Sequence, residues 1–168
     1  RNETDDTPMT HPIRPATPAD IPALTEIWYQ GWHEAHAADV PAALTALRTR
    51  DDFTRRLIGF DAGLRVGGPD GAPLGFVALK PDEINQLYVA PSARGTGLAA
   101  ALMADAEARL AAGGTPIARL DCGLGNHAAA RFYARQGWRE EGVIEVMLDT
   151  SDGPFPLPVR RFTKRLSQ

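Results

Sequence analysis

The chain has 168 residues, of which 43% are hydrophobic and 23% charged, with a formal net charge of -3. This size and composition are typical of a soluble globular protein and exclude a disordered or fibrous chain. No run approaches the roughly 18 apolar residues of a membrane span. The net charge gives no overall attraction to nucleic acid or to anionic lipid, so any bound anion must be held by local geometry.

The cysteine content and the beginning of the chain bear on location. Cys122 is the only cysteine, so no internal disulfide or multi-cysteine metal site is possible, and we expect a cytoplasmic protein. The first residues lack the basic and then apolar pattern of a secretion signal. We interpret residues 1–8, which precede Met9, as a tag or a disordered extension, and residues 9–168 as a single domain.

The first half of the chain predicts a strand, then helices, then strands. "HPIRPAT" is typical of an edge strand because its prolines leave ladder hydrogen bonds unmade. Thr17 as N-cap and Pro18 at the first helical position predict a helix that lasts to about Gly31. We expect a connection over 32–41, then one or two shorter helices up to residue 58, with Asp51 and Asp52 capping the second.

The second half predicts an alternation of strands and helices. "DAGLRVGG" and "APLGFVALK" indicate a hairpin, and "EINQLYVA" a third strand. A helix over 97–112, the strand "PIARLDC", the helix "NHAAARFYARQ" and the strand "VIEVMLD" follow. The tail begins as a proline-rich loop and ends in a strand near "VRRFTK". The fold class is therefore α/β, with a mixed sheet and a strand-helix-strand crossover at its centre.

The turn "SARGTGLAAALM", residues 92–103, suits a phosphate. A helix N-terminus offers unpaired amides and a partial positive charge. Gly95 and Gly97 remove Cβ atoms from the approach, and Arg94 adds a local cation. A purely structural glycine turn is an equally good interpretation of the turn alone. The sequence does not match the dinucleotide-binding fingerprint, because Ala100 stands where that pattern requires its third glycine. It does not match the nucleotide-triphosphate loop either, because that loop requires a lysine and none lies between Lys80 and Lys164.

From Ile13 to Leu166 the sequence resembles the GNAT superfamily of acetyl-CoA-dependent N-acetyltransferases. The family's pyrophosphate turn, (Q/R)xxGx(G/A), is matched by Arg94, Gly97 and Ala99. A second family pattern, an N..A..FY...G run followed by an aromatic, is matched by Asn126, Ala129, Phe132, Tyr133, Gly137 and Trp138. The resemblance implies the GNAT fold, a sheet of six to seven strands splayed at its middle, with about four helices on both faces.

The resemblance also implies where acetyl-CoA, the co-substrate, would bind. It assigns the pyrophosphate to Arg94, Gly95, Thr96, Gly97, Leu98 and Ala99, the pantetheine arm to Leu87, Tyr88 and Val89, and further contacts to Asn126, Ala129, Phe132 and Tyr133. Two splayed strands would leave unpaired backbone groups for the amides of an extended arm. By resemblance, the Val89 N–H polarises the thioester carbonyl, where acyl transfer gains most from a hydrogen-bond donor.

Two residues are candidates for the proton transfers that acyl transfer to an amine requires. Tyr133 matches the family's tyrosine that protonates the CoA sulfur; the alternative is an aromatic that packs on a helix face. Glu83 opens the strand where many relatives place a general base that acts through water; the alternative is a solvated turn residue.

Residues 32–36 and a group of arginines are candidates for contact with the acceptor. Trp32, His33 and His36 follow the first predicted helix where relatives wall the acceptor pocket, although they could merely pack. The two histidines are three apart with no third ligand evident, so no metal is expected. Four arginines could hold an acceptor carboxylate, but this spacing is more typical of a solvated helix face: Arg48, Arg50, Arg55 and Arg56.

The sequence as a whole predicts an N-acetyltransferase that moves an acetyl group to a primary amine of a small molecule by direct attack in a ternary complex. The alternatives are a non-catalytic acyl-CoA-binding sensor or interaction module, and a protein acetyltransferase. No nucleic-acid or membrane partner is expected. A homodimer is plausible because "VRRFTKRL" could present a free strand edge.

Overall fold

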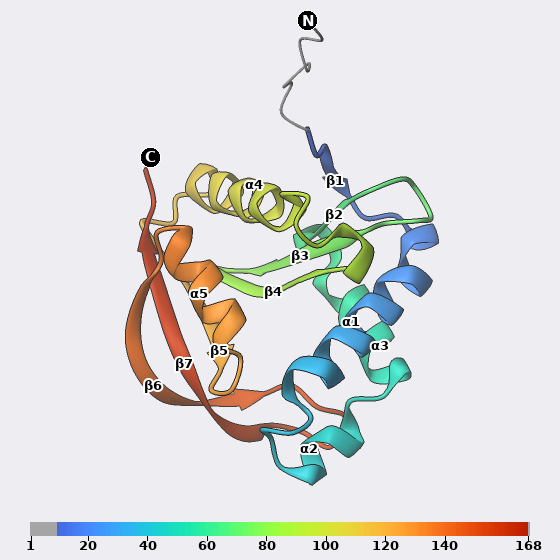
Figure 1. Ribbon diagram of the computed structural model, residues 1–168, viewed down its shortest axis with the longest axis vertical. Coiled ribbons are helices and arrows are strands. Elements are labelled where there is room, and N and C mark those ends of the chain that lie inside the picture. Colours follow the sequence, from blue (N-terminus) through green and yellow to red (C-terminus); the bar gives the residue numbers. More distant parts are fainter. Residues whose placement is uncertain (1–9, 168) are drawn as a thin grey trace, which may run out of the picture.

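The computed structural model describes residues 10–167, so the prediction about residues 1–8 lies outside the described range. Seven strands form one mixed sheet in the order β1-β2-β3-β4-β5-β7-β6, and this confirms the expected α/β fold class (Figure 1). Neighbouring strands are antiparallel except β4 and β5, which are parallel. The strands are β1 (Ile13–Pro15), β2 (Leu64–Gly67), β3 (Gly75–Lys80), β4 (Glu83–Val89), β5 (Ile117–Gly123), β6 (Arg139–Leu148) and β7 (Phe155–Arg165).

Helices cover both faces of the sheet. Those of the described chain are α1 (Ile21–His36), α2 (Ala42–Leu47), α3 (Arg50–Phe60), α4 (Leu98–Ala112) and α5 (His127–Arg135). Figure 1 shows α4 and α5 on one side of the strands and α1 and α3 on the other. Each side has its own core: Leu102 and Met103 of α4 pack over one face, and Trp28 of α1 and Phe53 of α3 over the other. Both cores depend on apolar burial, the dominant favourable term in folding.

The first long helix extends beyond its predicted end. It continues to His36, so the prediction of a connection over 32–41 was wrong for residues 32–36. Gly31 is not a helix terminator here. A Cβ at this position would lie 2.7 Å from Cδ1 of Tyr88, so the glycine allows the ring of Tyr88, on β4, to pack against the helix. The extra turn brings Trp32 and His36 toward the middle of the sheet.

The cap of α3 also differs from the prediction. Thr49, not Asp51 or Asp52, is the N-cap, and its hydroxyl accepts a hydrogen bond from the Asp52 amide at 3.1 Å. A threonine at this position satisfies one of the free amides of the first turn. The Asp52 carboxylate is thereby released for a buried ion pair described below.

The tail forms a longer strand than expected, and the strand is not an edge. Pro156 and Pro158 lie within β7, where they are opposite Met147 and Glu145 of β6. The β5 partners begin only at Val159, so the prolines lie where β7 has no second neighbour and no ladder bond is lost. Beyond that point β7 is paired on both sides, so the expected free edge at "VRRFTKRL" was wrong and β6 is the outer strand.

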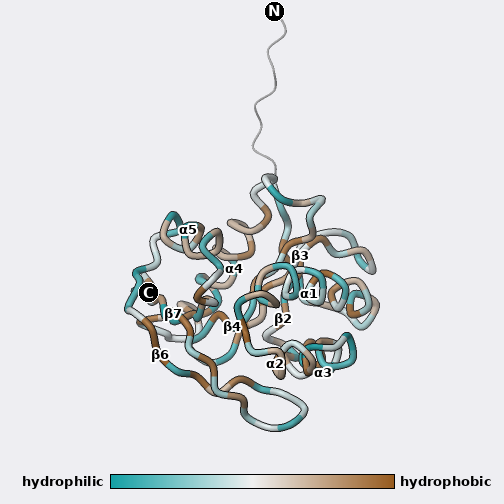
Figure 2. The backbone as a smooth tube through the Cα atoms, turned by 60° about the horizontal axis from the view of Figure 1, so that its bottom comes forward, coloured by the Kyte–Doolittle hydropathy of each residue, from teal (hydrophilic) through white to brown (hydrophobic). Residues whose placement is uncertain are grey.

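Hydropathy follows this layering. Figure 2 shows hydrophobic residues along β3, which is covered on both faces, and mostly hydrophilic residues along α3. Within residues 10–167, no helix combines the length and the apolar character that crossing a membrane requires.

Candidate active site

The sheet opens between β4 and β5. The two parallel strands are in register only at Glu83 with Arg119 and Ile84 with Leu120. Directly after these pairs, Asn85 has no partner on β3 and the β3–β4 register shifts, which marks a β-bulge. A bulge bends its strand, and bulges are frequent beside functional sites. Residues 86–89 of β4 therefore diverge from β5 and have no strand partner on that side.

A cavity of about 540 Å³ lies at this opening. Its walls come from the end of α1, from α2 and α3, from the two diverging strands, from α5 and the loop before it, and from the ends of β6 and β7 that face them. In Figure 1 these elements meet in the lower middle of the molecule. The volume falls in the range of small-molecule sites.

Glu83 and Tyr133 both line this cavity, on different elements. The Glu83 carboxylate accepts a hydrogen bond from Asn85 at 3.1 Å and one from Arg119 at 3.4 Å, and its side chain is 18% exposed. The Tyr133 ring packs against Phe132 and Phe162, with ring centroids 5.7 and 5.6 Å away. Burial raises the pKa of the Tyr133 hydroxyl above its ordinary value, so at neutral pH it carries its proton and can donate it.

The turn before α4 has the geometry of an anion cradle. Gly95 and Gly97 have φ angles of +75° and +89°, which glycine adopts without a Cβ clash. The first hydrogen bond of the helix runs from the Ala101 amide to the Gly97 carbonyl, so the amides of residues 98–100 have no partner within the helix. Leu98 anchors the turn because its side chain is buried in the core. The residues present therefore fit a pyrophosphate.

Arg94 of the same turn is exposed and forms an ion pair with Glu34 of α1 at 3.1 Å. Thr96 is fixed by three hydrogen bonds: its hydroxyl and its amide both donate to the Ala93 carbonyl, and its own carbonyl contacts His11 at 2.7 Å. None of residues 94–99 lines the 540 Å³ cavity. The turn is therefore a separate surface feature beyond the cavity.

The second sequence pattern divides between the cavity and the core. Asn126 and Ala129 line the cavity, and the Asn126 side chain also caps α5 by accepting a hydrogen bond from the Ala129 amide at 3.2 Å. Phe132 packs against the core under α4 and does not line the cavity.

Trp32 and His36 reach the cavity, whereas His33 does not. His36 Nε2 lies 3.3 Å from the Tyr88 hydroxyl, and its ring packs so closely on β5 that a Cβ on Gly123 would be 2.7 Å from it. The imidazole therefore spans the opening between the two strands. Burial lowers the pKa of His36, with a smaller opposing effect of Asp39, so the ring is neutral at neutral pH. His33 instead contacts the Arg48 carbonyl at 2.8 Å, beside a surface groove.

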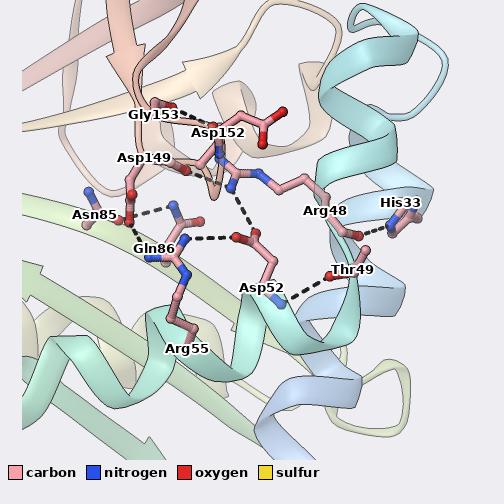
Figure 3. A network of polar contacts seen from close by, with 11 residues as sticks. His33, Arg48, Thr49, Asp52, Arg55, Asn85, Gln86, Asp149, Asp152 and Gly153 are labelled. Atoms are coloured by element: carbon pink, nitrogen blue, oxygen red, sulfur yellow. Dashed lines mark hydrogen bonds and ion pairs between the residues drawn. The ribbon is translucent and has the colours of Figure 1, made fainter.

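Sequence reasoning did not foresee a buried ion network beside the cavity (Figure 3). The Arg48 guanidinium donates to the Asp52 carboxylate at 2.9 Å and to the Asp149 carbonyl at 2.7 Å. Both side chains of the pair are 1% exposed. Arg55 donates to the other Asp52 oxygen at 2.9 Å. The i,i+4 spacing of Arg48, Asp52 and Arg56 was visible in the sequence, but the same spacing is common on solvated helices.

Cys122 and the histidines offer no sign of other chemistry. The thiol is buried, and burial raises its pKa to about 11, so a nucleophilic thiolate is disfavoured. Among the residues that the structure describes, no group of three or more His, Cys, Asp or Glu side chains could hold a metal ion.

Comparisons with known proteins agree with this geometry. Residues 22–138 match the family model for the acetyltransferase (GNAT) family. The chain is 34% identical over 109 residues to an uncharacterized N-acetyltransferase of Archaeoglobus fulgidus, a match that covers 58% of this chain and 74% of the relative.

Solved structures match nearly the whole chain. A GCN5-related N-acetyltransferase from Rhodopseudomonas palustris is 26% identical, with a TM-score of 0.72 and coverage of 95% of this chain and 98% of that one. PaiA N-acetyltransferase from Thermoplasma acidophilum, in complex with coenzyme A, is 18% identical with a TM-score of 0.69, over 94% of this chain and 99% of that one. The family model and the relative from Archaeoglobus fulgidus show that the chain belongs to the GNAT acetyltransferase family.

Proposed function

We propose that the protein transfers the acetyl group of acetyl-CoA to a primary amine of a small molecule by direct attack in a ternary complex. The observation that carries this proposal is the opening between β4 and β5, which has a cavity of small-molecule size at its base and an anion-binding turn beyond it. Acetyl-CoA supplies the activated acetyl thioester. Positioning the amine against the thioester can contribute several kcal/mol, and the proton transfers described below add to it.

The cofactor residues divide into two groups. The amides at the start of α4 that have no partner within the helix, together with the glycine turn of residues 95–97 and the Arg94 guanidinium, would hold the pyrophosphate. The main-chain groups of Leu87, Tyr88 and Val89, which lack β5 partners, would bind the pantetheine amides as an added strand does. Asn126 and Ala129 would contact the arm from the start of α5, and Phe132 would support Tyr133 from the core.

The chemistry requires the ammonium group to lose two protons and the sulfur to gain one. Glu83 accepts the first ammonium proton through a water, since its partly exposed carboxylate faces the cavity. The amine nitrogen then forms a bond to the thioester carbonyl carbon, and the carbon–sulfur bond breaks with its electron pair moving to sulfur. Tyr133 donates to the departing thiolate the hydroxyl proton that its raised pKa retains. The second nitrogen proton leaves the adduct and returns through water to the Tyr133 oxygen. The Val89 N–H would stabilise the developing oxyanion.

Binding and turnover can be tested separately. Calorimetry should detect acetyl-CoA binding to the wild type, weakened by Arg94→Glu because a repulsive charge replaces a cation at the cradle. Arg139→Glu, the same charge change at an exposed position on β6, should bind normally. Absence of any coenzyme A binding by the wild type would refute the proposal.

Turnover is followed as thiol release with a panel of amines. Tyr133→Phe keeps the ring contacts but removes the proton, so kcat should fall by roughly 100-fold with little change in acetyl-CoA affinity. Tyr29→Phe, beside the surface groove, is the matched control. Equal kcat in the wild type and Tyr133→Phe would remove Tyr133 from the chemistry. Acetyl-CoA binding without thiol release for any small amine would refute the small-molecule acceptor and leave the sensor and the protein acetyltransferase as alternatives.

A further inference from the structure

Arg56 differs from the other arginines of the cavity. Four arginines line it, and three have a carboxylate partner: Arg48 pairs with Asp52, Arg119 with Glu83 and Arg161 with Asp121. Within residues 10–167, no carboxylate forms an ion pair with Arg56, and its guanidinium makes no hydrogen bond. A cation that is partly buried without a counter-ion carries a desolvation cost that a bound anion would offset.

The surroundings of Arg56 hold the guanidinium in place without neutralising it. Its Cζ lies 4.4 Å from the centroid of the Trp28 ring, and Trp28 is fully buried. Stacking on a fixed aromatic face orients the planar fork, and such an arginine loses less freedom when it binds a carboxylate. Burial, and then the nearby Arg48, lower the pKa of Arg56 to about 10, so the side chain still carries its charge at neutral pH.

The charges around this end of the cavity leave an excess of one. The guanidinium groups of Arg48, Arg55 and Arg56 face the carboxylates of Asp52 and Asp149. The two carboxylates are both held by Arg55, and Asp52 also by Arg48. Three guanidinium groups thus face two carboxylates, and Arg56 is the one of the three that forms no ion pair with them.

Arg50 provides an internal comparison. It also stacks on an aromatic ring, with Cζ 4.1 Å from the centroid of Tyr29, but it lies outside the cavity, half exposed, and is paired with Glu26 at 2.6 Å. The same helix thus has one stacked arginine with a carboxylate supplied by the chain and one without. Beside Arg56, the position that Glu26 fills at Arg50 is not filled by any carboxylate of the described residues.

We infer that Arg56 binds a carboxylate of the acceptor, so the substrate class is an amine that carries a carboxylate, of which amino acids are the simplest members. This inference rests on the proposed function, since it names the acceptor of the same site. One carboxylate of the ligand would supply the partner that Arg56 lacks, and an Arg–carboxylate pair is the geometry that a guanidinium fork favours. Arg56 is then a specificity residue that orients the amine within the cavity.

The experiment compares matched acceptors and matched variants. Thiol release is measured with the standard L-amino acids and with their carboxamides, which keep the amine and lose the negative charge. For the wild type, the best amino acid should have kcat/KM at least about 10-fold above that of its carboxamide. Arg56→Gln should raise KM for the amino acid by a similar factor with little change in kcat, because uniform binding is lost.

Two further variants keep the test interpretable. Arg56→Lys retains the charge and should recover part of the carboxylate preference, which separates loss of charge from loss of folding. Arg50→Gln removes the stacked arginine outside the cavity and should leave the preference unchanged. Equal kcat/KM for amino acids and carboxamides, or an Arg56→Gln variant that keeps the preference, would overturn the inference while leaving acetyl transfer intact.

A binding measurement covers the case in which no amine is turned over. Calorimetry of the wild type saturated with coenzyme A should detect N-acetylated amino acids and not their carboxamides, and Arg56→Gln should abolish the signal. If thiol release fails for every amine but this selective binding is seen, the proposed function fails and the carboxylate subsite stands. If neither the acids nor the carboxamides bind, or both bind equally, the subsite is refuted.

Discussion

The two sides of the site are built from different parts of the chain. On the side that we assign to acetyl-CoA, the functional groups are main-chain amides and carbonyls, exposed by a bulged strand at Asn85 and by a turn with two positive φ angles. On the side that we assign to the acceptor, they are side chains of α1 and α3, held by ring contacts and buried ion pairs. Main-chain groups suit a ligand common to a family, whereas side chains can change without altering the fold.

This difference predicts that charge loss is most damaging on the acceptor side. Arg48→Met should lower the free energy of unfolding by about 3 kcal/mol, because it removes one partner of a pair that is 1% exposed and leaves a buried carboxylate less well paired. Arg50→Met removes an exposed, solvent-screened pair and should cost much less. Urea unfolding of the two variants measures both values. Equal costs would mean that the buried network contributes nothing beyond a surface ion pair.

The cofactor side should instead be sensitive to backbone geometry. Gly97→Ala places a Cβ at a φ of +89°, which should cost about 1 kcal/mol and distort the amides that would hold the pyrophosphate, so acetyl-CoA affinity should fall. Gly114→Ala, at the other end of α4 with φ at +93° and open space around it, carries the same backbone cost. The acetyl-CoA affinity of Gly114→Ala should be the same as that of the wild type, and calorimetry measures both. A similar loss of affinity in both variants would trace the effect to the helix and not to the turn.

The same division explains what could be predicted from the sequence. The strand-helix-strand crossover of β4, α4 and β5 could be predicted from local signals, namely the apolar runs of the strands, the glycine turn and the helix after it. The family patterns containing Gly97 and Tyr133 are likewise short and contiguous. The position of the expected cofactor residues therefore needed little long-range information.

The acceptor side could not be predicted in this way, because its signals are contacts between distant segments. Gly31 was interpreted as a helix end, whereas its small size accommodates Tyr88, 57 residues later. Arg50 is exposed and fits the expectation of a solvated helix face, but Arg48, two residues earlier, is buried. Periodicity alone does not separate these cases, since buried Arg48 and exposed Arg55 both have aspartates at helical spacing. Only the packing of α3 against α1 and the sheet decides which arginine meets solvent.

The smallest expected effect concerns His36, where the two sides meet. Burial lowers its pKa in the folded protein, and in the unfolded chain the ring titrates near its ordinary value of about 6.5. Below that pH the unfolded chain binds more protons than the folded one, so stability is fully present above it and declines as the pH falls. His36→Gln should reduce the loss of unfolding free energy between pH 7.5 and 5.5, measured by urea titration, whereas exposed His127→Gln should not. An unchanged pH dependence in His36→Gln would contradict this expectation. It would indicate that Asp39 offsets the cost of charging the buried ring in the folded protein, so that the ring can hold a proton while it spans the opening between β4 and β5.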